Sequence, residues 1–188
     1  MSGLRRSGDA PAPHVGRLHH RRAGAEQPGR GRHRDRRAHG AFRDFSAEVT
    51  VGENPLDSKV KAVVKTDSVD TGNADRDAFV KSNDFFDVAQ FPEMTFESTG
   101  FAADGDKYTM TGDLTINGIT KPVTFDVDFD GYTGDPWNNH RAGVYAQATV
   151  NRNDWGITWN APLESGGVML NEKVKLELDL QMVQPKGE

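Results

Sequence analysis

Carboxylates and an arginine are the side chains whose types and spacing could support chemistry in this sequence. Asp126, Asp128 and Asp130 alternate with apolar residues in VTFDVDFDG, and Arg152 and Asp154 lie in NRNDWG. Two carboxylates held close together can carry out general acid–base catalysis. Aspartates at every second position share one face of an extended strand, however, and charged side chains usually occupy a solvated face. We therefore interpret the three aspartates as a solvated strand face.

Arg152 is a candidate for binding an anionic group, because a guanidinium pairs well with a phosphate or a carboxylate. Asp154 could orient this guanidinium, and Tyr145 and Arg76 are two further candidates for contacting the polar head of a ligand. The alternatives are that Arg152 forms a salt bridge with a neighbouring acid and that Asp154 makes a turn. The sequence leaves both interpretations open.

Metal, thiol and serine chemistry find little support in the sequence. The chain has no cysteine, which excludes disulfides, thiolate catalysis and cysteine-ligated metals. Five of the six histidines lie in residues 1–41, and neither H-x-H nor H-E-x-x-H occurs after them. The G-x-S-x-G pattern of hydrolases is absent. We therefore expect no catalytic residues, no metal site and no cofactor, and we predict that the protein is not an enzyme.

The first 41 residues differ sharply in charge from the rest of the chain. They hold ten arginines, no lysine and three acids, a net charge of +7, whereas residues 42–188 hold 13 basic and 25 acidic residues, a net charge of −12. A segment with so few large apolar residues cannot offset its ordering entropy by burial. We therefore predict an Arg/His/Gly-rich disordered segment at 1–40 and a folded domain at 41–188. An arginine-rich tail can bind nucleic acid or anionic membranes, but we expect no specific nucleic-acid partner.

Membrane and secretion signals are not visible in the sequence. No apolar run approaches the roughly 18 residues that indicate a transmembrane helix, so we expect no transmembrane segment. The first residues are basic but lack the apolar core of a secretory signal. We therefore expect a cytoplasmic location.

Alternating apolar and polar residues predict antiparallel strands from residue 42 onward. The clearest runs cover residues 45–51, 123–129 and 174–182, and Asn117-Gly118 is a strong hairpin signal. The stretch GNADRDAFVKSNDFFDVAQFP breaks the alternation and predicts a short helix capped by Asn73 or Asp75. The patterns together indicate an all-β fold of about seven strands, either a barrel or a sandwich.

Several blocks of this sequence resemble the YceI-like family of polyisoprenoid- or lipid-binding proteins. They are GAFRDFSAEV, RDAFVKSNDFFDVAQFPEMTFEST, GDLTINGITKPVTFDVDF, VNRNDWGI and NEKVKLELDLQ, and they cover essentially all of residues 40–184. The resemblance implies an antiparallel, lipocalin-like barrel with a short helical insert, whose interior takes a long isoprenoid or other lipid chain. It implies binding, sequestration or transport of that lipid rather than catalysis.

The resemblance fails before residue 40. The family begins with an extended strand, but RLHHRRAGAEQPGRGRHRDRRAH stands in its place and cannot alternate. We therefore expect a missing or altered first strand. Our hypothesis is a frameshift, because the bias toward Arg, Gly, Ala, Pro and His is what G/C-rich codons give out of frame. A barrel that lacks a strand has two unpaired edges and a slot in its wall, which would favour a homodimer.

The apolar face of the predicted strands is the candidate site for a lipid ligand. The residues expected to line it are Phe96, Leu114, Ile116, Phe125, Val127, Phe129, Val144, Trp155, Leu176 and Leu178. The residues expected to plug one end of the barrel are Phe79, Phe85, Phe86 and Phe91. Burial of a lipid tail is favourable by about 0.8 kcal/mol per methylene group.

Two alternatives to a lipid-binding interior stay open. The same side chains could fill a dry core, since an eight-stranded barrel is just wide enough to be filled by them. An enzyme acting on a small apolar or quinone-like substrate could also use the same interior.

Overall fold

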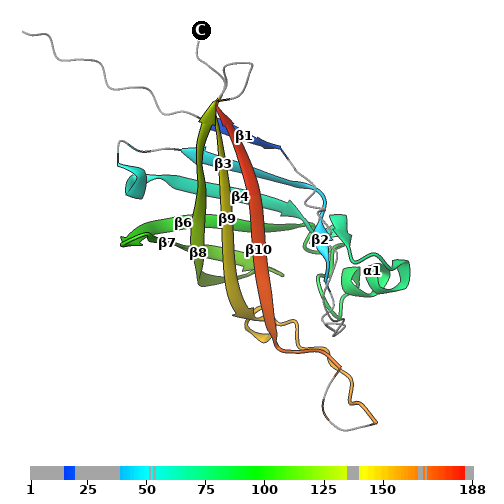
Figure 1. Cartoon of the computed structure of the whole chain (residues 1–188). Helices are drawn as coiled ribbons and strands as arrows, with labels where there is room; N and C mark the ends of the chain where they lie inside the picture. The colour runs from blue at the N-terminus through cyan, green and yellow to red at the C-terminus, as the bar shows by residue number, and fades with distance from the viewer. Residues whose placement is uncertain are drawn as a thin grey trace, which may run out of the picture.

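The structure, a computed structural model, describes residues 15–19, 39–50, 52, 54–134, 140–164, 167 and 169–184. Within these residues, antiparallel strands form a closed barrel in the order β1-β10-β9-β8-β7-β6-β4-β3 (Figure 1). The barrel strands are β1 (Val15–His19), β3 (Phe45–Thr50), β4 (Lys59–Lys65), β6 (Glu93–Asp104), β7 (Lys107–Ile116), β8 (Ile119–Gly134), β9 (His140–Asn151) and β10 (Lys173–Gln184). This architecture confirms the prediction of an all-β antiparallel barrel.

Shorter elements connect the barrel strands. A separate two-stranded sheet pairs β2 with β5. The short elements are β2 (Ala41–Phe42), β5 (Val69–Asp70), α1 (Ala74–Lys81) and the 3₁₀ turns η1 (Pro55–Asp57), η2 (Thr66–Ser68) and η3 (Arg152–Trp155). The helix α1 confirms the predicted short helical insert. No helix in the described part of the chain is long and apolar enough to cross a membrane.

The β7–β8 hairpin follows directly from its turn residues. Asn117 and Gly118 both have a positive φ, 49° and 71°, as a type I′ turn requires. The ladder then runs from Ile116 opposite Ile119 to Tyr108 opposite Val127. This register places the apolar residues of both strands on the same side of the sheet, which is the inside of the barrel.

The strand β1 comes from the arginine-rich segment and closes the barrel near one end. Its residues pair with Glu48–Thr50 of β3 and with Gln181–Val183 of β10. The expectation that both neighbouring edges are wholly unpaired is therefore wrong: the first strand is short and altered rather than missing. Five residues are sufficient here because backbone groups pair on both sides. Residues 1–14 and 20–38 lie outside the described residues, so disorder and a frameshift there stay predictions.

The helical insert leaves the barrel at the end of β4 and returns at the start of β6. Its two ends are bonded together, because Thr66, which is fully buried, donates from its backbone N–H to the Pro92 carbonyl (3.0 Å) and from its hydroxyl to the Phe91 carbonyl (2.7 Å). The side chain of Asn73 caps α1 by accepting from the Arg76 backbone N–H at 2.9 Å. Asn73 is thus one of the two caps predicted from the sequence.

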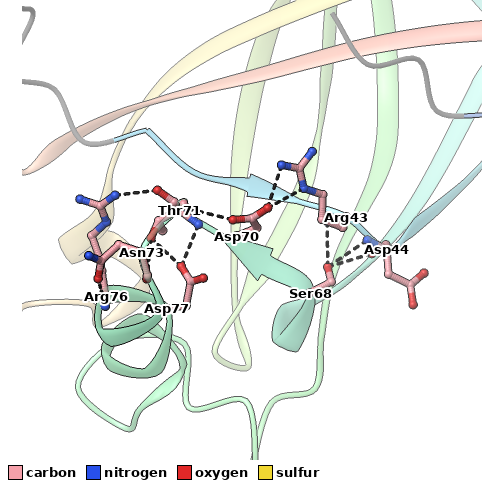
Figure 2. A network of polar contacts seen from close by, with 9 residues as sticks. Arg43, Asp44, Ser68, Asp70, Thr71, Asn73, Arg76 and Asp77 are labelled. Carbon is pink, nitrogen blue, oxygen red and sulfur yellow. Dashed lines mark hydrogen bonds and ion pairs between the residues drawn. The ribbon is translucent and has the colours of Figure 1, made fainter. Parts of the chain in front are cut away.

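A network of polar contacts fixes this insert against the start of the folded chain (Figure 2). Arg43 donates to one carboxylate oxygen of Asp70 from Nε (3.0 Å) and from Nη2 (2.8 Å). Asp77 of α1 accepts from both the backbone N–H (2.7 Å) and the hydroxyl (2.5 Å) of Thr71. These contacts hold α1 beside one end of the barrel, which is where Figure 1 shows it.

Candidate functional site

The inward side of the barrel is mostly apolar, and its residues differ greatly in how well they are packed. One part, which we call the packed half, consists of the inward residues of β6, of β7 and of β8 as far as Val127. The other part, which we call the thin half, consists of the inward residues of β9, β10, β3 and β4 together with Phe129 of β8. The division matters because only poorly covered side chains leave room for a ligand.

In the packed half the barrel fills its own interior. The rings of Phe96 and Phe125 meet edge to face with centroids 5.3 Å apart, and Phe125 is only 3% exposed. Gly112 makes this contact possible, because a Cβ there would lie 2.4 Å from Cζ of Phe96. The expected lining residues that lie in this buried cluster are Phe96, Leu114, Ile116, Phe125, Val127 and Trp155.

In the thin half the inward side chains are small or only partly covered. The small inward residues are Ala47, Ala62, Ala146 and Ala148. The expected lining residues Val144, Leu176 and Leu178 pack against the core but are only partly buried. Phe129 is 52% exposed, and its ring contacts only Tyr108 among the described rings, edge to face at 5.3 Å. Apolar surface therefore stays accessible along this half.

Aromatic side chains gather at the end of the barrel that carries α1. Phe79 and Phe85 contact Trp159 with ring centroids 4.6 and 5.8 Å away, and Phe86 contacts Phe42 at 5.4 Å. These contacts place the expected plug residues Phe79, Phe85 and Phe86 over this end of the barrel.

The β7–β8 turn contacts the same insert. A Cβ on Gly118 would lie 2.9 Å from the Phe91 ring, so the fourth expected plug residue packs on this turn. Asn117 donates from Nδ2 to the Phe85 carbonyl at 2.6 Å, and its buried Oδ1 has no partner among the described residues. The turn therefore holds the insert with both its backbone shape and a side-chain hydrogen bond.

Arg152 is buried and bonded to backbone carbonyls. Its Nη1 donates to Ile157 (2.6 Å) and Trp159 (2.8 Å), and its Nε donates to Asn171 (3.1 Å). Among the described residues no carboxylate pairs with it, and the contacts seen there are to backbone carbonyls rather than to a neighbouring acid. Because three backbone segments are tied together by one guanidinium, the contacts seen for Arg152 hold together the connection between β9 and β10. Trp155, at the other end of the same 3₁₀ turn, donates from Nε1 to the Leu114 carbonyl at 3.1 Å.

The other three candidates for a polar head group lie away from the inward side. Tyr145 faces outward, where its hydroxyl donates to Glu177 at 2.5 Å, and this bond raises the pKa of the phenol above its ordinary value. Arg76 is exposed on α1 and donates to the Thr71 carbonyl at 2.6 Å. Asp154 is exposed and lines an open groove of about 460 Å³ with Lys121. The structure does not bring these candidates together.

Metal ligands do not cluster in the described part of the chain, where no group of three or more His, Asp or Glu side chains could hold an ion. The predicted absence of a metal site concerns the whole chain and stays a prediction. The outward aspartates Asp126 and Asp128 are exposed, in keeping with a solvated strand face.

Comparison with known proteins identifies the family. The family model described as the YceI-like domain matches residues 25–182. This chain belongs to the YceI-like family. A UPF0312 protein of Yersinia pestis (strain Pestoides F) is 40% identical to it over 149 residues, which are 79% of this chain and 74% of the relative. A UPF0312 protein of Pectobacterium carotovorum is 44% identical over 121 residues, which are 64% of this chain and 63% of the relative.

Two solved structures share the YceI-like fold. The Campylobacter jejuni YCEI protein superposes with a TM-score of 0.68 and 23% identity, covering 86% of this chain and 94% of that one. BcnA of Burkholderia cenocepacia superposes with a TM-score of 0.61 and 23% identity, covering 78% of this chain and 87% of that one. At this identity the likeness shows the fold alone.

Sequence reasoning missed several residues that shape the interior of this YceI-like barrel. The alanines of the thin half stand at apolar positions of the alternating pattern, so the pattern could have found them as the places where little side-chain volume enters the barrel. Gly112 stands at such a position too. By contrast, no local signal shows that Trp159 meets Phe79, because that contact joins parts of the chain that lie far apart.

Proposed function

We propose that this YceI-like protein binds a long apolar lipid inside its barrel, with a polyisoprenoid as the leading candidate, and sequesters or carries it. The observation that supports the proposal is the incomplete burial of apolar side chains in the thin half. Inward-facing Val144, Leu176 and Leu178 keep accessible surface, and Phe129 is 52% exposed, although all four belong to the apolar face. A lipid tail that covered them would gain about 25 cal/mol for each Å² of apolar surface removed from water.

The shape of the barrel favours a long ligand. The aromatic residues of the insert cover one end, whereas Phe129 stands toward the opposite end of β8. The thin half extends between them along β9 and β10. A chain-like molecule lying along these strands would contact each of the partly covered side chains.

Catalysis in the same interior is the alternative, and no contact in the structure favours it. It needs a titratable group free to meet a substrate inside the barrel. Tyr145 and Asp154 are directed outward or exposed, and the three described bonds of Arg152 all go to backbone carbonyls.

Native mass spectrometry of the purified full chain, followed by solvent extraction, tests lipid binding. We expect an apolar molecule bound at one per chain. Val144→Trp adds a large side chain to the thin half and should remove most of the bound molecule. Thr149→Trp, which adds the same side chain to an exposed position of β9, is the matched control and should leave it bound. A wild-type chain that is folded by circular dichroism yet carries and accepts no apolar molecule would overturn the proposal.

A further inference from the structure

Three aromatic rings meet across one end of the thin half. The two outermost strands of this half are β9 and β4, with β10, β1 and β3 between them in the barrel order. From the end of β4 the chain runs into the insert that carries α1 with Phe79 and then Phe85, and the connection after β9 carries Trp159 (Figure 1). The ring of Trp159 meets those of Phe79 and Phe85 with centroids 4.6 and 5.8 Å away. Because the rings come from both outer strands, they span the end of the thin half.

A second ring contact closes the same end. Phe86 of the insert meets Phe42 edge to face at 5.4 Å, and Phe42 lies in β2, shortly before β3 of the thin half. Phe42, Phe85 and Phe86 also pack against the buried core of the barrel. The aromatic rings therefore stand between the interior and the rest of the insert. An apolar chain that lay along the thin half would meet them at its end.

Hydrogen bonds from the barrel hold the backbone beneath two of these rings. Nη1 of Arg152, at the end of β9, donates to the Trp159 carbonyl at 2.8 Å. Nδ2 of Asn117, in the β7–β8 turn, donates to the Phe85 carbonyl at 2.6 Å. Both donors belong to the ends of long barrel strands, so the barrel itself fixes where the rings lie. The rings consequently form a boundary at a set position.

The strand β9 defines the length of the interior that ends at this boundary. Val144 is the lining residue of β9 that lies farthest from the rings, and β9 ends beside them at Asn151. Seven residues of antiparallel strand separate the two, a distance of about 24 Å at about 3.4 Å per residue. The inward residues between them are the small Ala146 and Ala148 and the partly buried Val150. They leave a path along the strand, and the aromatic rings stop it.

We propose that Phe79, Phe85 and Trp159, which we call the end wall, limit the length of the apolar chain that the interior binds. The inference rests on the proposed lipid binding and adds a length specificity to it. Each part of a chain that fits between the end wall and Val144 is removed from water, which is favourable. Any part beyond that length stays outside and gains nothing. The affinity should therefore rise with chain length up to about 24 Å, the span of the strand, and then stay constant.

Competition among linear isoprenoid alcohols of graded length tests this specificity. The delipidated full chain is incubated with an equimolar mixture of farnesol, geranylgeraniol and solanesol, and native mass spectrometry measures the bound share of each. For the wild-type chain we expect more bound geranylgeraniol than farnesol, and no more bound solanesol than geranylgeraniol. The three probes carry the same hydroxyl group, so a difference between them reports the length of the chain.

Trp159→Ala and Phe79→Ala each remove one ring of the end wall. Either variant should raise the bound ratio of solanesol to geranylgeraniol at least about tenfold, a discrimination that even one methylene group can produce in an apolar pocket. Tyr145→Ala is the matched control, because it removes an aromatic ring that faces outward from β9. It should keep the wild-type ratio. Circular dichroism verifies that every variant is folded, and two wall variants are made so that one remains if the other does not fold.

The outcomes separate the end wall from lipid binding itself. A folded wild-type chain that binds none of the three alcohols overturns both proposals. A wild-type chain whose bound share still rises from geranylgeraniol to solanesol overturns the end wall alone. Folded wall variants that keep the wild-type ratio do the same, and so does an equally large shift in Tyr145→Ala. In these three cases the lipid-binding proposal still stands, because the alcohols are bound.

Discussion

The packed half and the thin half of the barrel are built from the same alternating pattern of apolar and polar residues, but they differ in how far their side chains fill the interior. Phe125 on β8 and Ala146 on β9 both face inward and are 3% and 2% exposed. The ring of Phe125 fills the interior, whereas the methyl group of Ala146 leaves space beside it. Leu178, which pairs with Ala146, is only partly buried as a result. The difference teaches that inward direction alone does not make a residue part of a solid core. The volume of the neighbouring side chains, on the same strand and on the paired strands, determines whether an inward residue is tightly packed.

The largest expected effect is a difference in stability between a variant of the packed half and a variant of the thin half. Phe125→Ala should lower the free energy of unfolding by about 3–5 kcal/mol, because it removes a ring that contacts Phe96 and leaves a cavity. Leu178→Ala should cost less than about 2 kcal/mol, since a partly exposed leucine loses fewer contacts. Urea unfolding followed by tryptophan fluorescence measures both. Equal losses would mean that the thin half is packed as tightly as the other.

The next effect concerns the buried arginine that holds the connection between β9 and β10. Arg152→Met should cost about 3 kcal/mol, because three backbone carbonyls lose a charged donor. Arg43→Met is the matched control: its exposed ion pair with Asp70 should be worth no more than about 1 kcal/mol. Urea unfolding compares the two variants, and similar losses would contradict the structural role of Arg152.

Two glycine variants test how tightly the packed half is filled. Gly112→Ala should cost about 1–3 kcal/mol, because the new Cβ would lie 2.4 Å from the Phe96 ring and 2.5 Å from the Glu97 carbonyl. Gly100→Ala on the neighbouring strand meets nothing within 4 Å and should be neutral or slightly stabilising. Thermal unfolding measures the two variants side by side. A neutral Gly112→Ala would show that Phe96 has room to move.

The smallest effect lies on the outer surface of the thin half and depends on pH. The hydrogen bond to Glu177 raises the pKa of Tyr145, so its contribution to stability should be complete below the ordinary tyrosine pKa and should disappear as pH rises through the raised value. Glu177→Gln should lower the pKa of Tyr145, because the carboxylate charge that disfavours the phenolate is removed. Ultraviolet titration of the phenolate measures this pKa, with Tyr145→Phe identifying the signal. An unchanged titration in Glu177→Gln would contradict the contact.

Much of the fold could be predicted from the sequence because its signals are local. Alternation assigned Phe125 and Val127 to one face of a strand, and Asn117 with Gly118 gave the hairpin. The sequence offered two caps for the helix, and Asn73 is the one that caps it. Each of these depends on residues within a few positions of one another. Local geometry alone is enough to fix them.

The candidate site could be predicted only in part, because alternation gives the face of a residue but not its depth. Phe96 and Leu178 share the inward face, and only the closed barrel buries one and leaves the other partly exposed. The same limit applies to Tyr145, whose outward partner Glu177 lies on the neighbouring strand.

What the sequence by itself determined is therefore the class of the fold, its faces and its main turns. Only the tertiary structure decided that β1 bridges β3 and β10 and that Arg152 binds the carbonyls of Ile157, Trp159 and Asn171. The physical reason is that these features depend on which segments meet when the sheet closes. Closure is a property of the whole chain and leaves no mark in any short stretch of it.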